Sequence, residues 1–421
     1  MKRFVSVLTV LVLIAAVVLT GCGKPSGEST PPAQGGAEQK VTLRLSGWTS
    51  GSGAEADILN SLLADFKAQN PNIDVKYEPV PDRFKEKIQA DFAANSEPDV
   101  FYVDSFWGVD WMSKNLLLPL DDYIAKANVN VADFEPSLLR AFQFGGKTYG
   151  LPKGYSPLGL FYNKDLFAKA NIAEPPKTWE ELRADAKKLT SGSVKGLVLS
   201  YDHARFMPFV WMAGGTPISA DKTNITINSP EAVTALDYYT GLITKDKVAA
   251  TPKDLGAEWA GDAFAKGTAA MALEGHWMLP FLNEKKVAFS WGVAELPAGP
   301  KARSNFVFTV SYSISARSKH PEEAFKLVNF LTSPESQKKV AELGLELPSR
   351  KSVATPEFLA AKPERQVLLA GAAYAQPFVY TPNSQPWADE LNKAMENVVL
   401  NGANPKAELD RVQQKFQDTK Q

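Results

Sequence analysis

"VTLRLSGWTSGSGAEADILNSLLADFKAQNPNIDVKYEPV", residues 41–80, decides the fold class. It begins with a short β-rich run, residues 41–48, and continues with residues 54–71, in which large apolar side chains recur at helical spacing until Asn-Pro stops the helix. Residues 73–80 then alternate apolar and polar or charged side chains, as a strand at the edge of a sheet does. Strand, helix and strand in this order form a crossover unit, and its repetition builds an α/β fold.

The same signals recur along the chain. "PDVFYVD" is a continuous apolar strand that ends in Asp104. Thr178, with Glu181 three residues later, forms a capping box that opens a helix. Ser229 with Pro230 opens another helix. Two more helices are expected after residue 320, and the last helix of the chain is expected at about 386–400, so helices and strands alternate along the chain.

The size and charge of the chain limit the choice of function. About 380 residues follow residue 40, which exceeds the size at which a single core keeps growing, so two lobes are expected. The net charge is −1, and removal of residues 1–21 would leave 44 basic against 47 acidic residues. Such a balance predicts no nucleic-acid partner.

The N-terminus has the layout of a secretion signal. Lys2 and Arg3 precede an uncharged, mostly apolar run that extends to Gly23, with small residues at its end where a signal would be cut. An uncleaved membrane helix is the alternative interpretation. Leu19-Thr20-Gly21-Cys22 resembles the cleavage box of bacterial lipoproteins, so residues 1–21 are predicted to be a signal peptide and Cys22, the only cysteine, to be acylated, for instance by palmitate. Residues 22–40, rich in Gly, Ser, Pro and Gln, are predicted to be a flexible tether.

Catalytic and cofactor motifs are weak. Neither G-x-S-x-G nor H-E-x-x-H occurs, and His203, His276 and His320 lie far apart without the spacing of metal ligands. Residues 51–56 match G-x-G-x-x-A, a dinucleotide signature, but the motif is short and NAD is scarce outside the membrane. We therefore expect no cofactor, no metal and no enzyme. What remains is a turn with free N–H groups that suits a polar ligand.

Asp104 and several tryptophans point to ligand binding. A carboxylate at the C-terminal end of a buried strand faces the crevice where open α/β sheets bind ligands, although it could instead cap the helix that follows. A sugar presents an apolar C–H face and a rim of hydroxyls, so its pocket combines flat rings with charged or amide hydrogen-bonding groups. Five tryptophans are interpreted mostly as core: Trp107, Trp111, Trp211, Trp259 and Trp291.

Residues 146–182, "GKTYGLPKGYSPLGLFYNKDLFAKANIAEPPKTWEEL", resemble a known family. The motif Y-N-K-D-L-F followed by P-P-K-T-W-E-E-L is similar to that of the maltose-binding-protein-like solute-binding proteins of bacterial ABC transporters. "FAKGTAAMALEGHW", residues 319–350 and "NPKAELDRVQQKF" agree in the same order. The resemblance covers nearly the whole chain from residue 41.

The resemblance implies a two-lobed α/β fold of the type II periplasmic-binding-protein class, in which each lobe is a sheet flanked by helices. The chain crosses between the lobes three times, near residues 154–157, 306–311 and 354–363. The implied N-terminal lobe comprises residues 41–155 and 308–356. The C-terminal lobe comprises residues 156–307 and 357–421. Ligand binds between the lobes, which close on it by hinge motion.

The resemblance also nominates ligand-binding residues. Those expected to form hydrogen bonds are Asp104, Asp202 and Arg205, and those expected to cover sugar C–H faces are Trp48, Tyr155, Trp277 and Trp387. Glu274 and His276 depart from the family pattern beside the stacking tryptophan, and "DSFWG" does not match the pocket of the maltose binder. Membership of the family is therefore better founded than the identity of the sugar.

The function that follows is a non-catalytic, monomeric carbohydrate receptor on the outer face of the cell membrane, anchored through Cys22, which delivers its sugar to a permease. Two alternatives stay open. The same fold could take a peptide, a polyamine or a phosphorylated compound, although an anion would require clustered cations and only Arg205 is nominated. An anchored enzyme or adhesin is the alternative from a different class.

Overall fold

The crossover unit predicted from residues 41–80 is present. A computed structural model describes residues 40–49, 53–218, 225–376 and 384–417. In it β1 (Val41–Gly47) and β2 (Ile73–Pro79) pair in parallel, joined by α1 (Ala54–Gln69). The large apolar side chains of α1, spaced three or four residues apart, are buried against the sheet. Strand β2 is the outermost strand of its sheet, as its alternating pattern predicts.

The first sheet has the strand order β13-β12-β3-β1-β2, and β6 pairs with β12 beside this path. Strands β1, β2 and β3 (Val100–Asp104) are parallel, whereas β12 (Asn305–Ile314) runs antiparallel to β3 and to β6 (Gly150–Pro157). The elements associated with this half are α2 (Phe84–Ala94), α3 (Ser105–Ser113), α4 (Asp121–Lys126), η1 (Val131–Asp133), α5 (Pro136–Arg140), α12 (Pro321–Leu331), α13 (Pro334–Leu343) and the hairpin β4 (Gln143–Phe144) with β5 (Lys147–Thr148).

The second sheet has the order β11-β7-β10-β8-β9. Its strands are β7 (Gly159–Asn163), β8 (Leu197–Val198), β9 (Ala249–Ala250), β10 (Met271–Glu274) and β11 (Trp291–Ala294). Its helices are α6 (Lys164–Lys169), α7 (Trp179–Leu189), α8 (His203–Met212), α9 (Pro230–Thr244), η2 (Lys253–Leu255), α10 (Ala260–Ala265), α11 (Met278–Lys285), α14 (Pro356–Ala360), α15 (Pro363–Ala373), α16 (Ser384–Asn401) and α17 (Pro405–Gln417). Strand β13 (Ala375–Gln376) returns to β12. The helix predicted at about 386–400 is α16, but it is not the last, because α17 follows it.

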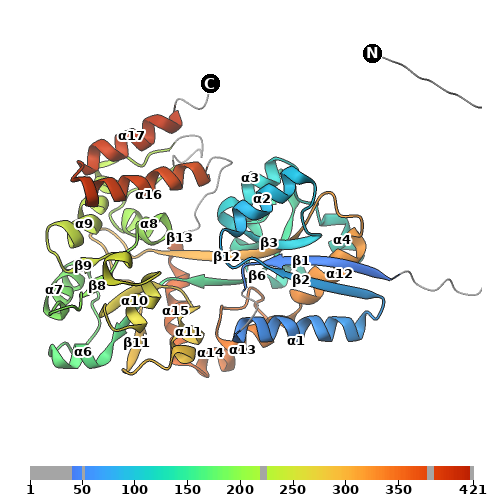
Figure 1. The fold of residues 1–421 in the computed structure, drawn as a ribbon, viewed down its shortest axis with the longest axis horizontal. Coiled ribbons are helices and arrows are strands. Elements are labelled where there is room, and N and C mark those ends of the chain that lie inside the picture. The colour runs from blue at the N-terminus through green and yellow to red at the C-terminus, as the bar shows by residue number, and fades with distance from the viewer. Residues whose placement is uncertain (1–39, 50–52, 219–224, 377–383, 418–421) are drawn as a thin grey trace, which may run out of the picture. The chain divides into compact units, whose positions relative to one another are not determined.

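Two long strands run from one sheet to the other. Strand β6 pairs with β12 along its length and leads directly into β7 of the second sheet (Figure 1). The first two implied crossings, near residues 154–157 and 306–311, lie in these strands. A third connection leads from α13, which packs on α1, to α15, which packs on β7 and β11. The predicted two-lobed α/β fold is confirmed, and Lys40–Gln421 form one compact unit.

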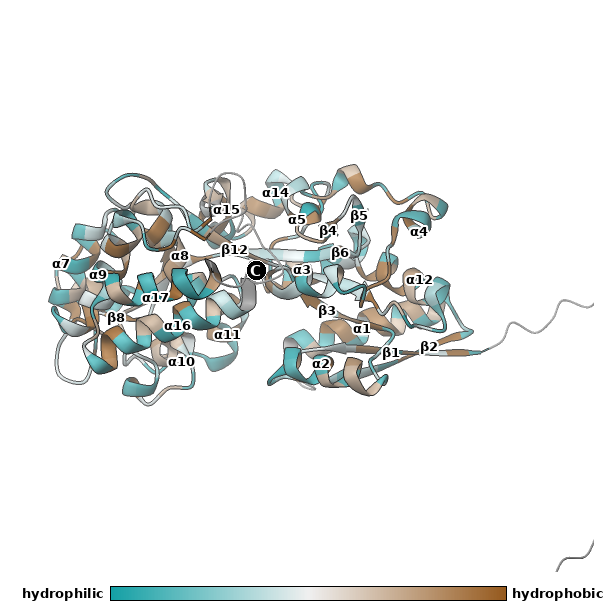
Figure 2. Cartoon of the chain, turned by 90° about the horizontal axis from the view of Figure 1, so that it is seen from above, coloured by the Kyte–Doolittle hydropathy of each residue, from teal (hydrophilic) through white to brown (hydrophobic). Residues whose placement is uncertain are grey.

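Local sequence signals explain the helix starts. The Thr178 hydroxyl accepts a hydrogen bond from the Glu181 N–H at 3.2 Å, and the Glu181 carboxylate accepts one from the Lys177 N–H at 2.6 Å, so the predicted capping box is formed. Ser229 caps α9 in the same way through the Ala232 N–H. Each lobe has its own apolar core, and the outward faces of α16 and α17 are mostly hydrophilic (Figure 2).

The predicted signal peptide, Cys22 and nearly all of the predicted tether lie outside the described residues, as do residues 50–52 of the dinucleotide-like motif. The exact lobe boundaries stay a prediction. Across the part of the chain that the structure describes, no helix combines the length and apolar character needed to cross a membrane.

Candidate functional site

Three charged residues meet at the carboxyl edge of the second sheet. Strands β8 and β10 are parallel neighbours, so their C-terminal ends lie at the same edge. Asp202 and Arg205 follow β8 at the start of α8, and Glu274 is the last residue of β10. Because the two strands end together, residues about 70 positions apart in sequence come into contact.

Arg205 holds both carboxylates. Its Nε and Nη2 donate to the two carboxylate oxygens of Glu274 at 3.2 and 2.6 Å, and Nη1 donates to Asp202 Oδ1 at 3.0 Å. Asp202 also caps α8 by accepting the Arg205 N–H at 3.1 Å. The planar guanidinium suits such a two-pronged contact with a carboxylate.

Trp277 completes this group. Its indole Nε1 donates to Glu274 Oε2 at 3.0 Å, and the Arg205 guanidinium lies 6.0 Å from the centre of the indole ring. The ring meets Phe308 of β12 edge to face at 5.2 Å. Asp202, Arg205, Glu274 and Trp277 are called the arginine cluster below. In it a partly exposed flat ring is fixed beside charged hydrogen-bonding groups.

Burial and pairing act in opposite directions on the charges of the arginine cluster. Burial alone would lower the pKa of Arg205, but Glu274 and Asp202 outweigh it and raise that pKa. Burial would raise the pKa of Asp202, but Arg205 and His203 outweigh it, so that pKa is lowered. Glu274, 1% exposed, is the exception, because burial raises its pKa despite Arg205. The Arg205 cation is therefore matched by carboxylates within the protein.

A second aromatic group lies at the carboxyl edge of the first sheet. Trp48, directly after β1, meets Phe84, Tyr102 and Trp107 at ring-centre distances of 5.4, 5.0 and 6.0 Å, each nearly perpendicular. These four residues are called the tryptophan cluster. Trp48 and Trp107 are only partly buried. Trp107, predicted to be core, packs against the core of the first half with part of its surface exposed, and it lies beside the nominated Trp48.

The other four tryptophans predicted to be core differ in burial. Trp111 is fully buried, as predicted. Trp211, Trp259 and Trp291 pack against the cores but keep part of their surface exposed.

Asp104 caps a helix. Its Oδ1 accepts the Phe106 N–H at 2.7 Å, which fixes the start of α3. Burial raises the pKa of this carboxyl to about 7. The capping alternative is thus realised in the structure, and a contact with ligand stays a prediction.

Two nominated aromatics are buried. Tyr155, 8% exposed, packs with Leu138 and Leu347. Trp387, 2% exposed, lies among the apolar residues of the core below α16. Both rings are enclosed by apolar neighbours, and a contact of either with ligand stays a prediction. The structure does bring together three other nominated residues, Asp202, Arg205 and Trp277.

Sequence reasoning missed an ion pair near the tryptophan cluster. Lys153 Nζ contacts Glu346 Oε1 at 2.9 Å, with side chains only 10% and 13% exposed, and lies 5.4 Å from the centre of the Tyr102 ring. The available signal was Lys153 itself, the one charged residue of strand β6. No sequence signal pointed to its partner Glu346, which lies nearly 200 residues further along the chain.

The halves also touch directly. Phe106, from α3, stacks on His203, from α8, with ring centres 4.2 Å apart. Each lies within two residues of a nominated carboxylate, Asp104 or Asp202. The carboxyl edges of the two sheets therefore approach each other at this point.

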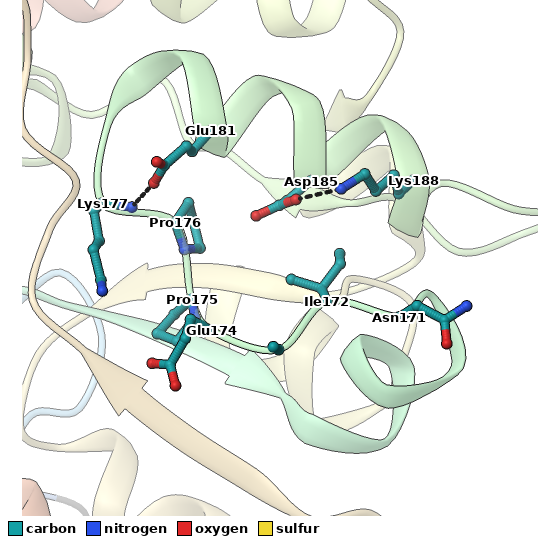
Figure 3. A pocket seen from close by; sticks show the side chains of 10 residues that line it. Asn171, Ile172, Glu174, Pro175, Pro176, Lys177, Glu181, Asp185 and Lys188 are labelled. Atoms are coloured by element: carbon teal, nitrogen blue, oxygen red, sulfur yellow. Dashed lines mark hydrogen bonds and ion pairs between the residues drawn. The ribbon is translucent and has the colours of Figure 1, made fainter.

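A separate pocket of about 270 Å³ lies between α6 and α7. In Figure 3 its polar groups are seen paired with each other, Glu181 with the Lys177 N–H and Asp185 with Lys188. It is lined by residues 171–177 and by Glu181, Asp185 and Lys188, and by none of the nominated residues. Within the described ranges no group of three or more His, Cys, Asp or Glu residues is placed to hold a metal ion.

Comparison with known proteins decides the family. The model of the family "Bacterial extracellular solute-binding protein" matches residues 50–338. The chain belongs to this family. A galactooligosaccharide-binding protein of Bacillus subtilis is 25% identical, with 96% of this chain and 94% of that protein aligned.

Solved structures agree in fold. An ABC substrate-binding protein from Listeria monocytogenes in complex with cycloalternan has a TM-score of 0.85 at 27% identity and covers 90% of this chain and 99% of its own. The acarbose receptor GacH of Streptomyces glaucescens has a TM-score of 0.81 at 25% identity and covers 90% and 98%. The family and these structures are binding proteins rather than enzymes, and such proteins work outside the cytoplasm.

Proposed function

We propose that this solute-binding protein is the carbohydrate receptor of an ABC importer and that its sugar binds between the two carboxyl edges. The observation that carries the proposal is the arginine cluster, where the ring of Trp277 is fixed by Glu274 and lies beside Arg205 and Asp202. A flat ring covers the C–H face of a sugar, and charged groups bond its hydroxyls. The ligands named for the similar proteins are cycloalternan, acarbose and galactooligosaccharides. They favour a neutral or oligomeric sugar as the ligand of this protein.

The charge balance of the arginine cluster favours a sugar over an anion. Arg205 is already bonded to two carboxylates, so it offers little unmatched positive charge to a phosphate or a peptide carboxylate. A polyamine would find carboxylates there, but both are bonded to Arg205. Hydroxyls can share these hydrogen-bonding groups without adding a charge. Asp202, Arg205 and Trp277, with Trp48 and Trp107 from the opposite edge, form the proposed binding surface.

We further propose that Cys22 is acylated, that residues 1–21 are removed, and that the protein is held as a monomer at the outer face of the membrane beside its permease. Cys22→Ser should then release the protein into the soluble fraction. Equal membrane retention of wild type and variant would instead favour an uncleaved N-terminal helix.

Thermal melting against a solute panel tests the carbohydrate proposal. The panel contains maltotriose, a galactooligosaccharide and acarbose, with a peptide, spermidine and glycerol phosphate as the competing classes. A ligand at 100 times its dissociation constant, binding only the native state, stabilises by about 2.7 kcal/mol. A raised melting temperature with a sugar alone supports the proposal. A rise with the peptide, amine or phosphate and with no sugar would reject it.

A further inference from the structure

Both clusters are attached to one short segment of chain. Residues 344–347, called the anchor segment, follow α13, which packs on the first sheet's α1 and α12. The anchor segment forms the beginning of the third connection between the halves, which leads from α13 to α15. The arginine cluster reaches it through His276, and the tryptophan cluster reaches it through Lys153.

His276 joins the arginine cluster to the anchor segment. It lies between Glu274 and Trp277 and is fully buried. Its Nδ1 lies 2.7 Å from the carbonyl oxygen of Gly344, and its backbone N–H donates to Ser156 Oγ at 2.6 Å. A carbonyl oxygen can only accept, so Nδ1 carries the proton. The four residues 274–277 thus place their outer members in the arginine cluster and His276 against the anchor segment.

Lys153 joins the tryptophan cluster to the same segment. Its ammonium group bonds Glu346 at 2.9 Å and lies over the ring of Tyr102, which packs on Trp48. Gly154 makes this approach possible, because a Cβ there would overlap the side chain of Glu346. The pair is largely buried, and removal of one partner would leave the other charge uncompensated.

The anchor segment is itself held firmly against β6. Tyr155 and Leu347 exchange backbone hydrogen bonds of 2.9 and 2.8 Å. The carbonyl oxygen of Pro152 accepts from Ser349 Oγ at 2.6 Å and from Gln337 Nε2 at 3.1 Å. A segment bonded on both sides to the strand that crosses between the halves can transmit the position of one cluster to the other.

We propose that His276 and Lys153 are positioning residues that fix the two binding clusters to the common anchor segment, so that sugar affinity depends on them although neither has to touch the sugar. This inference rests on the proposed function. It adds that the Gly344 carbonyl and the Glu346 carboxylate are the two attachment points. The His276→Leu and Lys153→Met variants should each weaken sugar binding about tenfold or more, and their losses in the double variant should not be independent.

The test is titration calorimetry on the full chain in detergent, with whichever of maltotriose, galactooligosaccharide or acarbose the wild type binds. His276→Asn is the rescue variant, because its amide nitrogen stands where Nδ1 stands in histidine and can donate to Gly344. It should keep affinity within about threefold of wild type. Two controls are Lys339→Met, which breaks an exposed ion pair on α13, and Thr178→Ala, which removes a distant helix cap.

The controls separate positioning from general stability. If Thr178→Ala lowers the melting temperature as much as His276→Leu does but leaves affinity unchanged, the loss in His276→Leu reflects positioning. Wild-type affinity in His276→Leu and Lys153→Met would overturn the inference while leaving the proposed function intact. Failure of the wild type to bind any panel sugar would overturn the proposed function itself. If His276→Leu does not fold, Lys153→Met decides the matter: a loss of about tenfold or more in sugar affinity supports the inference, and wild-type affinity overturns it.

Discussion

Replacing Arg205 by lysine tests whether the arginine cluster acts as one unit. Arginine makes three side-chain hydrogen bonds there, two to Glu274 and one to Asp202, whereas a lysine ammonium on a different stem can satisfy about one of them. Hydrogen bonds to charged groups contribute about 1.5–3 kcal/mol each. Lysine keeps the positive charge, so the pair with Glu274, whose side chain is only 1% exposed, is weakened rather than removed. The loss of about two of the three bonds should lower the free energy of unfolding by about 3–6 kcal/mol.

Urea denaturation of wild type and Arg205→Lys measures this loss. If the slope of the unfolding free energy against urea concentration is unchanged, the shift in the midpoint gives the difference in stability. Arg183→Lys is the matched control, because Arg183 bonds Asp246 at a site where its side chain is 47% exposed. That variant should lose about 1 kcal/mol or less. Sugar affinity should fall in Arg205→Lys and stay unchanged in Arg183→Lys. Losses of equal size in the two variants would refute the idea of a cooperative cluster.

Three further predictions concern Trp277, Asp104 and Glu390. Trp277→Ala should abolish sugar binding in calorimetry while the protein still melts cooperatively; unchanged affinity would remove Trp277 from the binding surface. Because burial raises the pKa of Asp104 to about 7, the stability contributed by its neutral form is complete below about pH 4 and is lost as pH rises to 7. Asp104→Asn keeps the helix cap, so the stability of this variant relative to wild type should increase from pH 4 to pH 7. A difference in stability that stays constant over this range would contradict the prediction. The carboxylate of Glu390 accepts hydrogen bonds from Lys415, Arg411 and Lys393, which lower its pKa to about 2. Its contribution to stability is therefore complete above about pH 4.5 and is lost as pH falls toward 2. Glu390→Gln should make the stability less dependent on pH in that interval, and an unchanged pH dependence would disprove the prediction.

Local signals were sufficient for the elements of the fold. The spacing in α1, the capping box at Thr178 and the cap at Ser229 each depend on residues within a few positions of one another, and the structure has all three where they were predicted. The length of the chain already predicted two lobes, and family resemblance added the crossings that join them. The resemblance also named Asp202, Arg205 and Trp277, which the structure brings together.

Other features depended on the path of the chain. Trp107 and Trp111 stand four positions apart on one face of α3, with ring centres 6.2 Å apart. Trp107 lies beside Trp48 and keeps part of its surface exposed, whereas Trp111 packs against Phe92 and Phe101 and is buried. The sequence by itself determined which segments form strands and helices, since periodicity and capping are local. Only the tertiary structure decided that Arg205 meets Glu274, because the neighbouring strands β8 and β10 end at the same edge. Likewise, only the tertiary structure decided that Lys153 meets Glu346, because the chain after α13 returns to pair with β6. In both cases charges far apart in sequence come together, and burial then makes the pairing necessary.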